Sequence, residues 1–541
     1  MAVKLECINY HFPHSERPCY HIKYRLEGDL EGELIISRIE VNGKWSRDYW
    51  VHNDGRFNPK NSFLPKRKNE LVVRADWEND GENTIKVKCQ EANGKALELS
   101  QSSRAPSSGG YWDKRWKYYG SNVIEETEGF AREGEPIHLL LGLYADRLKH
   151  PAGEIRVVGI DPESGIPEEV PCQVYGSSVW DKMRDEHCQP TTTVEVAFLA
   201  DVPALTSKVY LIFYGNPKAE SPKYSSDLRV SGKGYGLTVE NSHYKTLLHP
   251  KSGAIDEIHL KQNTNVVFDH HLETNGSLHW NPGVYAPPRT WIHASDWENP
   301  GGYSTIGGPV FFTTKRHAPL PLYPEVVCSV TYRFYANKPY IVVESMIDVT
   351  EDMDVVALRN GEIVLNRNVV REFAWKKADG DIGSVVITDR PRHPTRGMDL
   401  HIATPWFAFY NRGIPCALAV MNLEVSAYRR DRGLVEWAPW HYLHWGPWTY
   451  CARPLIYTFA TPNPQRVIHV SAGSSFYERM VFYPCRLGLS DEERFIPIEE
   501  TAAKLQHPLR ASVTHLDIDE RVPEEWVPPI LVDEFEEMGD D

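Results

Sequence analysis

Apolar and polar residues alternate along short segments through most of this chain, and this period of two predicts β-strands rather than helices. Examples are residues 32–41 (GELIISRIEV), 191–200 (TTTVEVAFLA) and 325–335 (EVVCSVTYRFY). Gly, Asn, Asp and Pro interrupt the pattern every few residues, as turns between antiparallel strands do. Residues 491–506 (DEERFIPIEETAAKLQ) are the best candidate for a helix. The chain is therefore predicted to be all-β.

The chain of 541 residues is too long for one hydrophobic core. A Ser/Pro/Gly-rich stretch at residues 100–110 predicts a linker, so residues 1–105 should form an N-terminal β-sandwich. Residues 111–227 predict a second small sandwich of antiparallel strands. Residues 228–490 have the longest strands and the most aromatic residues, which favours a large two-sheet sandwich. Residues 491–541 are expected to form a C-terminal extension with an acidic tail.

Residues 236–260 (GLTVENSHYKTLLHPKSGAIDEIHL) alternate as a strand, turn at Pro-Lys-Ser-Gly, and alternate again. This segment resembles the hairpin that opens galactose-mutarotase-like β-supersandwich domains. The resemblance is carried by the turn at 250–253 and by Val239, Glu240, Asn241, Tyr244, Ile255 and Ile258. It implies an all-β, multidomain fold in which two small N-terminal β-sandwiches precede a large antiparallel β-supersandwich. It also implies a carbohydrate-active enzyme, because such domains occur in polysaccharide lyases and in C-terminal parts of some glycoside hydrolases.

The formal net charge of −15 argues against a nucleic-acid binder with a broad basic surface. No apolar run approaches the roughly 20 residues that a bilayer span needs, and the N-terminus lacks the layout of a signal peptide. The nine cysteines include no Cys-x-x-Cys pair, so no zinc knuckle or redox dithiol is indicated. We therefore expect a cytoplasmic protein if the N-terminus is complete, without a nucleic-acid or membrane partner, either monomeric or homo-oligomeric.

Residues 275–297 (NGSLHWNPGVYAPPRTWIHASDW) combine aromatic, histidine and charged residues with three prolines that oppose regular sheet pairing. Such polar loops favour a cleft-lining role, and tryptophan rings can stack on sugars. The alternative is a long crossover whose tryptophans cap the sandwich. The candidate site residues in this segment are Asn275, His279, Trp280, Asn281, Tyr285, Arg289, His293 and Trp297.

Residues 436–457 (EWAPWHYLHWGPWTYCARPLIY) are rich in the same residue types, namely His, Trp, Tyr, Arg, Gly and Pro. The two segments would form one aromatic, cationic groove if they met in space. A third segment, residues 357–375, offers Arg359 before a turn as a carboxylate binder. The alternatives are histidines satisfied between strands for residues 436–457 and a solvated face for residues 357–375. Further candidates for substrate binding are His441, His444, Trp445, Tyr450 and Arg453.

A polysaccharide or oligosaccharide lyase that cleaves a uronic-acid-containing glycan by β-elimination is the preferred function. Elimination needs a base, an acid for the leaving oxygen and a group that neutralises the substrate carboxylate. His279 or His293 is the expected base and Tyr285 the expected acid. Asn281 and Arg359 are the expected carboxylate ligands, while Trp280 and Trp297 would stack on sugar rings.

Two alternatives stay open. A glycoside hydrolase would use a pair of carboxylates from Asp269, Glu273, Asp296, Glu362 and Glu436, which sequence cannot pair. A non-catalytic carbohydrate-binding protein would need only aromatic platforms. No cofactor is expected, although a divalent metal could neutralise a substrate carboxylate. A metal held by both His270 and His271 is disfavoured because neighbouring strand residues point to opposite faces.

Overall fold

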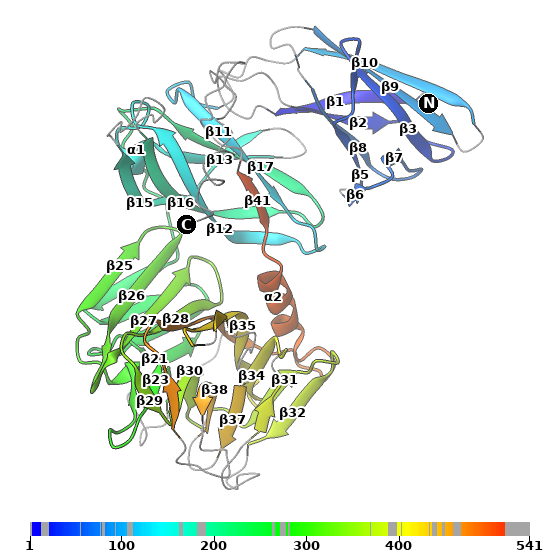
Figure 1. The fold of residues 1–541 in the computed structure, drawn as a ribbon. Helices are drawn as coiled ribbons and strands as arrows, with labels where there is room; N and C mark the ends of the chain where they lie inside the picture. The colour runs from blue at the N-terminus through cyan, green and yellow to red at the C-terminus, as the bar shows by residue number, and fades with distance from the viewer. Residues whose placement is uncertain are drawn as a thin grey trace, which may run out of the picture.

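A computed structural model describes the protein at residues 3–11, 21–54, 56–75, 77, 82–91, 94–104, 112–161, 166–180, 191–261, 266–270, 277–279, 282–367, 369–387, 398–401, 403–431, 433–434, 441–445, 449–457 and 467–513. Figure 1 shows two β bodies in blue and cyan, followed by a larger one in green to orange. All strand pairings in the described part of the chain are antiparallel, as alternation in the sequence predicts. The all-β, multi-sandwich prediction is confirmed.

Two sheets form the N-terminal sandwich and share one apolar core, which includes Leu5, Ile22, Ile36 and Val87. Residues of the predicted linker at 100–104 continue strand β10 instead, paired as far as Arg104 with Glu82. The first sheet has the order β1 (Lys4–His11), β2 (His21–Glu27), β8 (Asn69–Arg74), β5 (Tyr49–Asn53) and β6 (Arg56–Asn58). The second has the order β10 (Ala96–Arg104), β9 (Glu82–Glu91), β3 (Leu34–Val41) and β4 (Lys44–Ser46), with β7 (Ser62–Phe63) paired to β3.

The second sandwich likewise buries residues of two sheets in one core, for example Val157 and Ile212 against Leu139 and Val194. One sheet has the order β14 (Pro167–Val170), β13 (Arg156–Ile160), β17 (Ser207–Tyr214), β11 (Tyr118–Glu125) and β41 (Arg510–Val513). The other has the order β12 (Arg132–Tyr144), β16 (Thr191–Val202) and β15 (Cys172–Trp180). Strand β41 comes from the C-terminal extension, so that segment completes the second sandwich (Figure 1).

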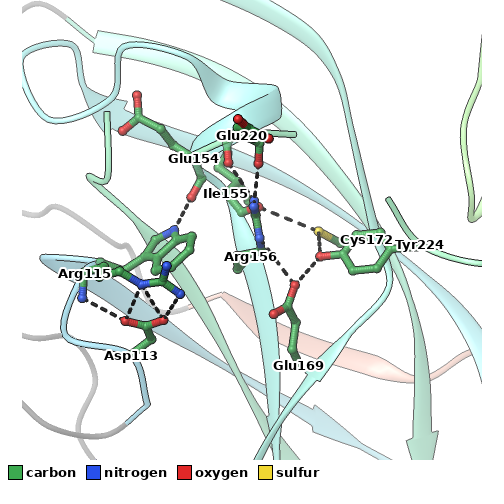
Figure 2. A network of polar contacts seen from close by, with 11 residues as sticks. Asp113, Arg115, Glu154, Ile155, Arg156, Glu169, Cys172, Glu220 and Tyr224 are labelled. Carbon is green, nitrogen blue, oxygen red and sulfur yellow. Dashed lines mark hydrogen bonds and ion pairs between the residues drawn. The ribbon is translucent and has the colours of Figure 1, made fainter. Parts of the chain in front are cut away.

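A polar network anchors the connector that leaves this sandwich for the next body (Figure 2). Arg156 donates to the carbonyl oxygens of Gly153 and Glu220, both at 2.7 Å, and lies 3.3 Å from the Glu169 carboxylate. The Tyr224 hydroxyl donates to the same carboxylate at 2.7 Å. Because Glu220 and Tyr224 belong to the connector, these bonds fix where the supersandwich begins. Helix α1 (Pro151–Glu154) ends directly beside this arginine.

The largest body packs three main sheets around one core, and short β29 (Met353–Val355) and β39 (Ile468–Val470) pair separately. A five-stranded sheet has the order β18 (Arg229–Lys233), β19 (Gly236–Glu240), β20 (Tyr244–Leu248), β21 (Ile255–Leu260) and β22 (Val267–Asp269). A ten-stranded sheet has the order β25 (Gly302–Gly307), β26 (Phe311–Leu320), β27 (Tyr323–Tyr335), β28 (Ile341–Val349), β40 (Ser474–Arg486), β35 (Cys416–Arg429), β34 (Trp406–Asn411), β31 (Glu372–Lys376) and β32 (Ile382–Val386), with β36 (Gly433–Leu434) on β35. A six-stranded sheet has the order β24 (Ile292–His293), β23 (Gly283–Tyr285), β30 (Ala357–Leu365), β38 (Thr449–Tyr457), β37 (His441–Trp445) and β33 (Met398–Leu400).

Helix α2 (Ile496–Gln506) confirms the helix predicted for residues 491–506 and lies between the last two bodies (Figure 1). Arg132 of the second sandwich binds its C-terminal end, donating to the carbonyl oxygens of Lys504 at 2.9 Å and His507 at 2.6 Å. The same guanidinium lies 3.3 Å from Glu126, and both side chains are almost fully buried. Carbonyl groups at a helix end have no partner within the helix, so Arg132 supplies one.

We predict that Arg132→Ala lowers the free energy of unfolding by about 3–5 kcal/mol, because removing one partner leaves the buried Glu126 carboxylate unpaired. The end of α2 should also exchange its amide hydrogens faster. Urea unfolding and hydrogen exchange measure these effects. Arg115→Ala is the control, because Arg115 pairs with Asp113 at an exposed position. Unchanged exchange in α2 would contradict the capping role.

Candidate functional site

The candidate site lies on the face of the six-stranded sheet that points away from the core, which we call the outer face. Directly paired residues of antiparallel strands point to the same face. Gly283 pairs with both His293 and Arg359, so these residues share one face. Val284 and Leu358, one position along, are buried in the core on the opposite face.

A β-bulge in β30 brings a second charged residue to the outer face. Asn360 pairs with Arg453 and Ile363 pairs with Cys451, so three steps along β30 oppose two steps along β38. The extra residue lies at Gly361, whose φ of +57° suits a glycine. In a regular strand, residues three apart point to opposite faces. The bulge instead lets Glu362 approach Arg359, with an oxygen–nitrogen distance of 3.1 Å.

Gly283 makes room for the imidazole of His293. A Cβ atom at position 283 would stand 2.5 Å from His293 Cδ2, so the ring lies directly over the glycine. From there, Nε2 of His293 is 3.6 Å from the Glu362 carboxylate and 3.5 Å from the Arg359 guanidinium. The Asp296 carboxylate accepts the His293 backbone N–H at 2.7 Å and lies 3.6 Å from Nδ1.

Arg359 stands at the centre of this group, with 6% of its surface exposed. Besides Glu362 and His293, its guanidinium donates to the Tyr442 hydroxyl at 2.5 Å. It also lies over the Trp291 ring at 4.3 Å and the Tyr450 ring at 5.8 Å. We call the set the Arg359 cluster; its members are Tyr285, Trp291, His293, Arg359, Glu362, Tyr442 and Tyr450.

Stacked rings form two walls of the Arg359 cluster. Tyr285 stacks on Trp291 at 5.1 Å, and Trp291 is nearly parallel to His293 at 5.8 Å. On the other side, His444 stacks on Tyr450 at 5.0 Å. Tyr285, Trp291, Tyr450 and His444 are half-buried, whereas the charged members are buried. The rings are therefore more exposed than the charges beside them.

The electrostatics of the cluster favour a charged arginine. Burial lowers the pKa of Arg359, but the Glu362 carboxylate and the hydroxyls of Tyr442 and Tyr450 raise it above its ordinary value overall. Arginine can only donate hydrogen bonds, so a neutral His293 offers Arg359 the lone pair of Nε2 and keeps its proton on Nδ1. On taking up a proton, Nε2 would face the Glu362 carboxylate.

A second charged group lies on the core face of the same sheet. Arg453 donates to Glu478 of β40 at 2.6 Å and to Asn422 of β35 at 2.9 Å. His441 Nε2 is 3.9 Å from the Glu478 carboxylate. Burial raises the pKa of Glu478 against the effect of Arg453, and burial together with the Arg453 charge lowers the pKa of His441 well below its ordinary value.

The structure brings together part of the predicted site. Tyr285 and His293 from the first segment meet Tyr450 and His444 from the second through Arg359 from the third. The three segments therefore meet on one sheet. Trp445 ends β37.

Other predicted site residues lie elsewhere. His279 is in the core, where Nδ1 is 2.7 Å from the Tyr332 hydroxyl and the ring packs edge-on against Phe482. Trp297 is also in the core and donates to a backbone carbonyl oxygen. Arg289, in the turn between β23 and β24, pairs with Glu325 at 2.5 Å. His279 and Trp297 are thus part of the apolar core, and within the described residues none of the three has a hydrogen bond, ion pair or ring contact with the Arg359 cluster.

His441 and Arg453 face the core rather than the Arg359 cluster. Neighbouring residues of a strand point to opposite faces, and the register places Tyr442, next to His441, on the outer face. Of the candidate carboxylates, Glu362 and Asp296 flank His293, while Asp269 ends β22 in another sheet. The following candidates lie outside the described residues: His271, Glu273, Asn275, Trp280, Asn281 and Glu436. The described residues contain no group of three or more His, Cys, Asp or Glu side chains placed to bind a metal ion.

Sequence reasoning missed Tyr442 and Glu478. Glu478 occupies a core-facing position in a strand whose other such positions hold Phe476, Met480 and Phe482. Arg453 likewise interrupts the apolar row of Cys451 and Leu455. A single charge in an alternating apolar row was the available signal, because a buried charge requires a partner.

Comparisons with solved structures give partial matches at low sequence identity. An alpha-mannosidase from Enterococcus faecalis V583 is 12% identical with a TM-score of 0.46, covering 75% of this chain and 47% of that chain. A glycosyl hydrolase family 38 protein from Enterococcus faecalis is 11% identical with a TM-score of 0.43, covering 75% of this chain and 48% of that one. The chain thus spans about half the length of these two proteins.

A galactose mutarotase-like protein from Lactobacillus casei ATCC 334 is 11% identical with a TM-score of 0.29, covering 46% of this chain and 100% of that chain. No protein-family model and no curated protein matches the sequence. Across the described residues, no helix combines the length and apolar character that a bilayer crossing requires.

The core position of His279 predicts a pH dependence of stability. Burial, with a contribution from Arg316, lowers the pKa of His279 to about 3. The unfolded chain binds a proton at this histidine below about pH 6.5, which the folded chain resists, so stability falls as the pH drops from there towards 3. One such group contributes a slope of up to about 1.4 kcal/mol per pH unit.

His279→Asn keeps a polar partner for Tyr332 but does not titrate in this range. We predict a flatter profile of unfolding midpoint against pH between 6.5 and 4.5 in this variant. His469→Asn is the control, since His469 is exposed beside Asp354. Identical slopes in wild type and His279→Asn would show that His279 is not held neutral by the fold.

Proposed function

We propose that this chain is a carbohydrate-active enzyme of the lyase type, which cleaves a uronic-acid-containing glycan by β-elimination at the Arg359 cluster. One observation carries the proposal: a single buried guanidinium contacts both a histidine and a tyrosine on one sheet face. β-Elimination needs these three parts together, namely a charge that neutralises the substrate carboxylate, a base and an acid.

In this proposal His293 removes the proton beside the substrate carboxylate. His293 is the base in this proposal, and Asp296, 3.6 Å from Nδ1, would stabilise the imidazolium that forms. Tyr442 supplies the proton for the leaving oxygen in place of Tyr285, because its hydroxyl lies 2.5 Å from the guanidinium that would hold the substrate carboxylate.

Arg359 neutralises the substrate carboxylate. Glu362 and Tyr442 occupy its terminal nitrogens, but its buried Nε has no hydrogen-bond acceptor within the described residues. An unsatisfied donor on a buried arginine favours an acceptor oxygen from a ligand. The half-buried rings of Trp291 and Tyr450 provide apolar surfaces for the sugar.

Glycoside hydrolysis is the second candidate, and Glu362 is the observation that favours it. Two carboxylates, Glu362 and Asp296, lie at opposite edges of the His293 ring. Glu362, whose carboxylate lies 3.1 Å from the Arg359 guanidinium, would be the base or nucleophile. Hydrolysis also needs a protonated carboxyl group as acid.

The test is incubation with a panel of uronic-acid and neutral glycans, following the ultraviolet absorbance of an unsaturated product together with reducing ends. Absorbance with new ends supports elimination, and new ends alone support hydrolysis. Binding without either product indicates a non-catalytic carbohydrate-binding protein and contradicts the proposal.

If elimination occurs, His293→Ala and Tyr442→Phe should each lower kcat by about 10²- to 10⁴-fold, the range for loss of a general base or acid. Glu362→Gln should have a smaller effect on elimination but should abolish hydrolysis. His469→Ala is the matched control because His469 also faces an aspartate but lies exposed, on β39. Full activity in His293→Ala would exclude this site.

A further inference from the structure

The Arg453–Glu478 pair is the most deeply buried charge pair in the supersandwich that the proposed chemistry leaves unused. The two side chains are 3% and 2% exposed, and they join the six-stranded sheet to the ten-stranded sheet. They face the core, so a substrate on the outer face does not reach them. Their contacts with the β30 backbone suggest another role.

Glu478 packs directly against the bulge in β30. A Cβ atom at position 361 would stand 2.9 Å from one Glu478 carboxylate oxygen, 3.0 Å from the other and 3.0 Å from Met480 Cε. The carboxylate and the Met480 methyl group therefore fill the space behind Gly361. Any other residue at 361 would also oppose its positive φ.

The residues around Gly361 are also held by side-chain contacts on the core side. Asn360 accepts a hydrogen bond from Ser345 of β28 at 2.8 Å, and its strand partner across the ladder is Arg453. Arg453 in turn binds Glu478 and Asn422. Strands β28, β35, β38 and β40 thus all contribute a side chain that holds the bulge from the core side.

We propose that Glu478 and Arg453 are positioning residues, which hold the β30 bulge so that Arg359 and Glu362 share the outer face with His293. The inference rests on the proposed function for its consequence, because the bulge matters to catalysis only if the Arg359 cluster is the site. Bulges are a known means of re-aiming a side chain next to an active site.

Stability alone is a poor explanation for the pair. A buried ion pair loses hydration on both partners, and replacing both by apolar residues of similar volume is often neutral or stabilising. A charge between Phe476 and Phe482 and its partner between Cys451 and Leu455 therefore need another reason, and shaping the bulge provides one. A stabilising role and a positioning role of the pair can be separated by experiment, because replacing both residues with apolar ones should change the site geometry without lowering the stability.

The test is the double variant Arg453→Met/Glu478→Leu in the full chain. We expect an unfolding midpoint at or above that of wild type, together with shifted nuclear magnetic resonance signals of the His293 imidazole. These signals are assigned as the ones that disappear in His293→Ala. Where a glycan is turned over, kcat should fall about 10- to 100-fold with little change in KM, as for misplaced catalytic groups. Wild-type resonances and wild-type kcat in a folded double variant would overturn the proposal.

The Glu126–Arg132 pair offers a matched control, because it is equally buried but joins the second sandwich to α2. Glu126→Gln should lower stability without moving the His293 signals, whereas Glu478→Gln should move them. If both variants move the signals alike, the effect is one of general stability and the proposal fails.

Gly361→Ala provides an independent route should the double variant not fold. Its Cβ meets the Glu478 carboxylate, so the same His293 signals should shift, and adding Glu478→Ala should partly restore them. Additive effects of the two substitutions would count against coupling between Glu478 and the bulge. These signals are measured without substrate. If wild type cleaves no glycan, the proposed function fails while the positioning role is still decided.

Discussion

The single extra residue at Gly361 is the constraint on which the arrangement of the candidate site depends. Without the bulge, strand alternation would send Arg359 and Glu362 to opposite faces, and a charge would enter the apolar core unpaired. With the bulge, both charges lie on the outer face at 3.1 Å, where they neutralise one another beside His293. The backbone geometry, the charge pairing and the position of the imidazole thus all depend on the bulge at Gly361.

Buried charges on the two faces of the sheet follow the same rule. Desolvating an arginine or a carboxylate costs several kcal/mol per ion in a folded protein, so each needs an opposite charge and further hydrogen bonds. Arg359 has Glu362 and the Tyr442 hydroxyl, and Arg453 has Glu478 and Asn422. Arg359 and Glu362 lie within two residues of Gly361 along β30, Arg453 lies across the ladder from Asn360, and the Glu478 carboxylate packs against Gly361 from the other sheet. Core packing is therefore coupled to the geometry of the outer face.

Local alternation predicted most of the fold, because strand period and turn residues are properties of neighbouring positions. The candidate site was predicted in part, since Tyr285, His293, Arg359 and Tyr450 come from segments of unusual composition. His279 and Trp297 come from the same kind of segment, yet they lie in the core. Their burial could not be predicted, because proline-rich stretches give no alternation from which to assign a face. Strand β41 pairs with β11 across almost 400 residues of sequence, and no local pattern contains that information.

The order of exposure within the Arg359 cluster also has a physical consequence. The charged side chains are buried, whereas the rings of Trp291 and Tyr450 that lie beside Arg359 are half-buried. Apolar rings exclude water and strengthen electrostatic interactions beside them, and fixed stacking holds the imidazole in place without reorganisation during proton transfer. His293 is held by Trp291 on its ring face, by Asp296 at Nδ1 and by Glu362 at Nε2. Its placement is therefore set by packing and charge together, as acid–base catalysis requires.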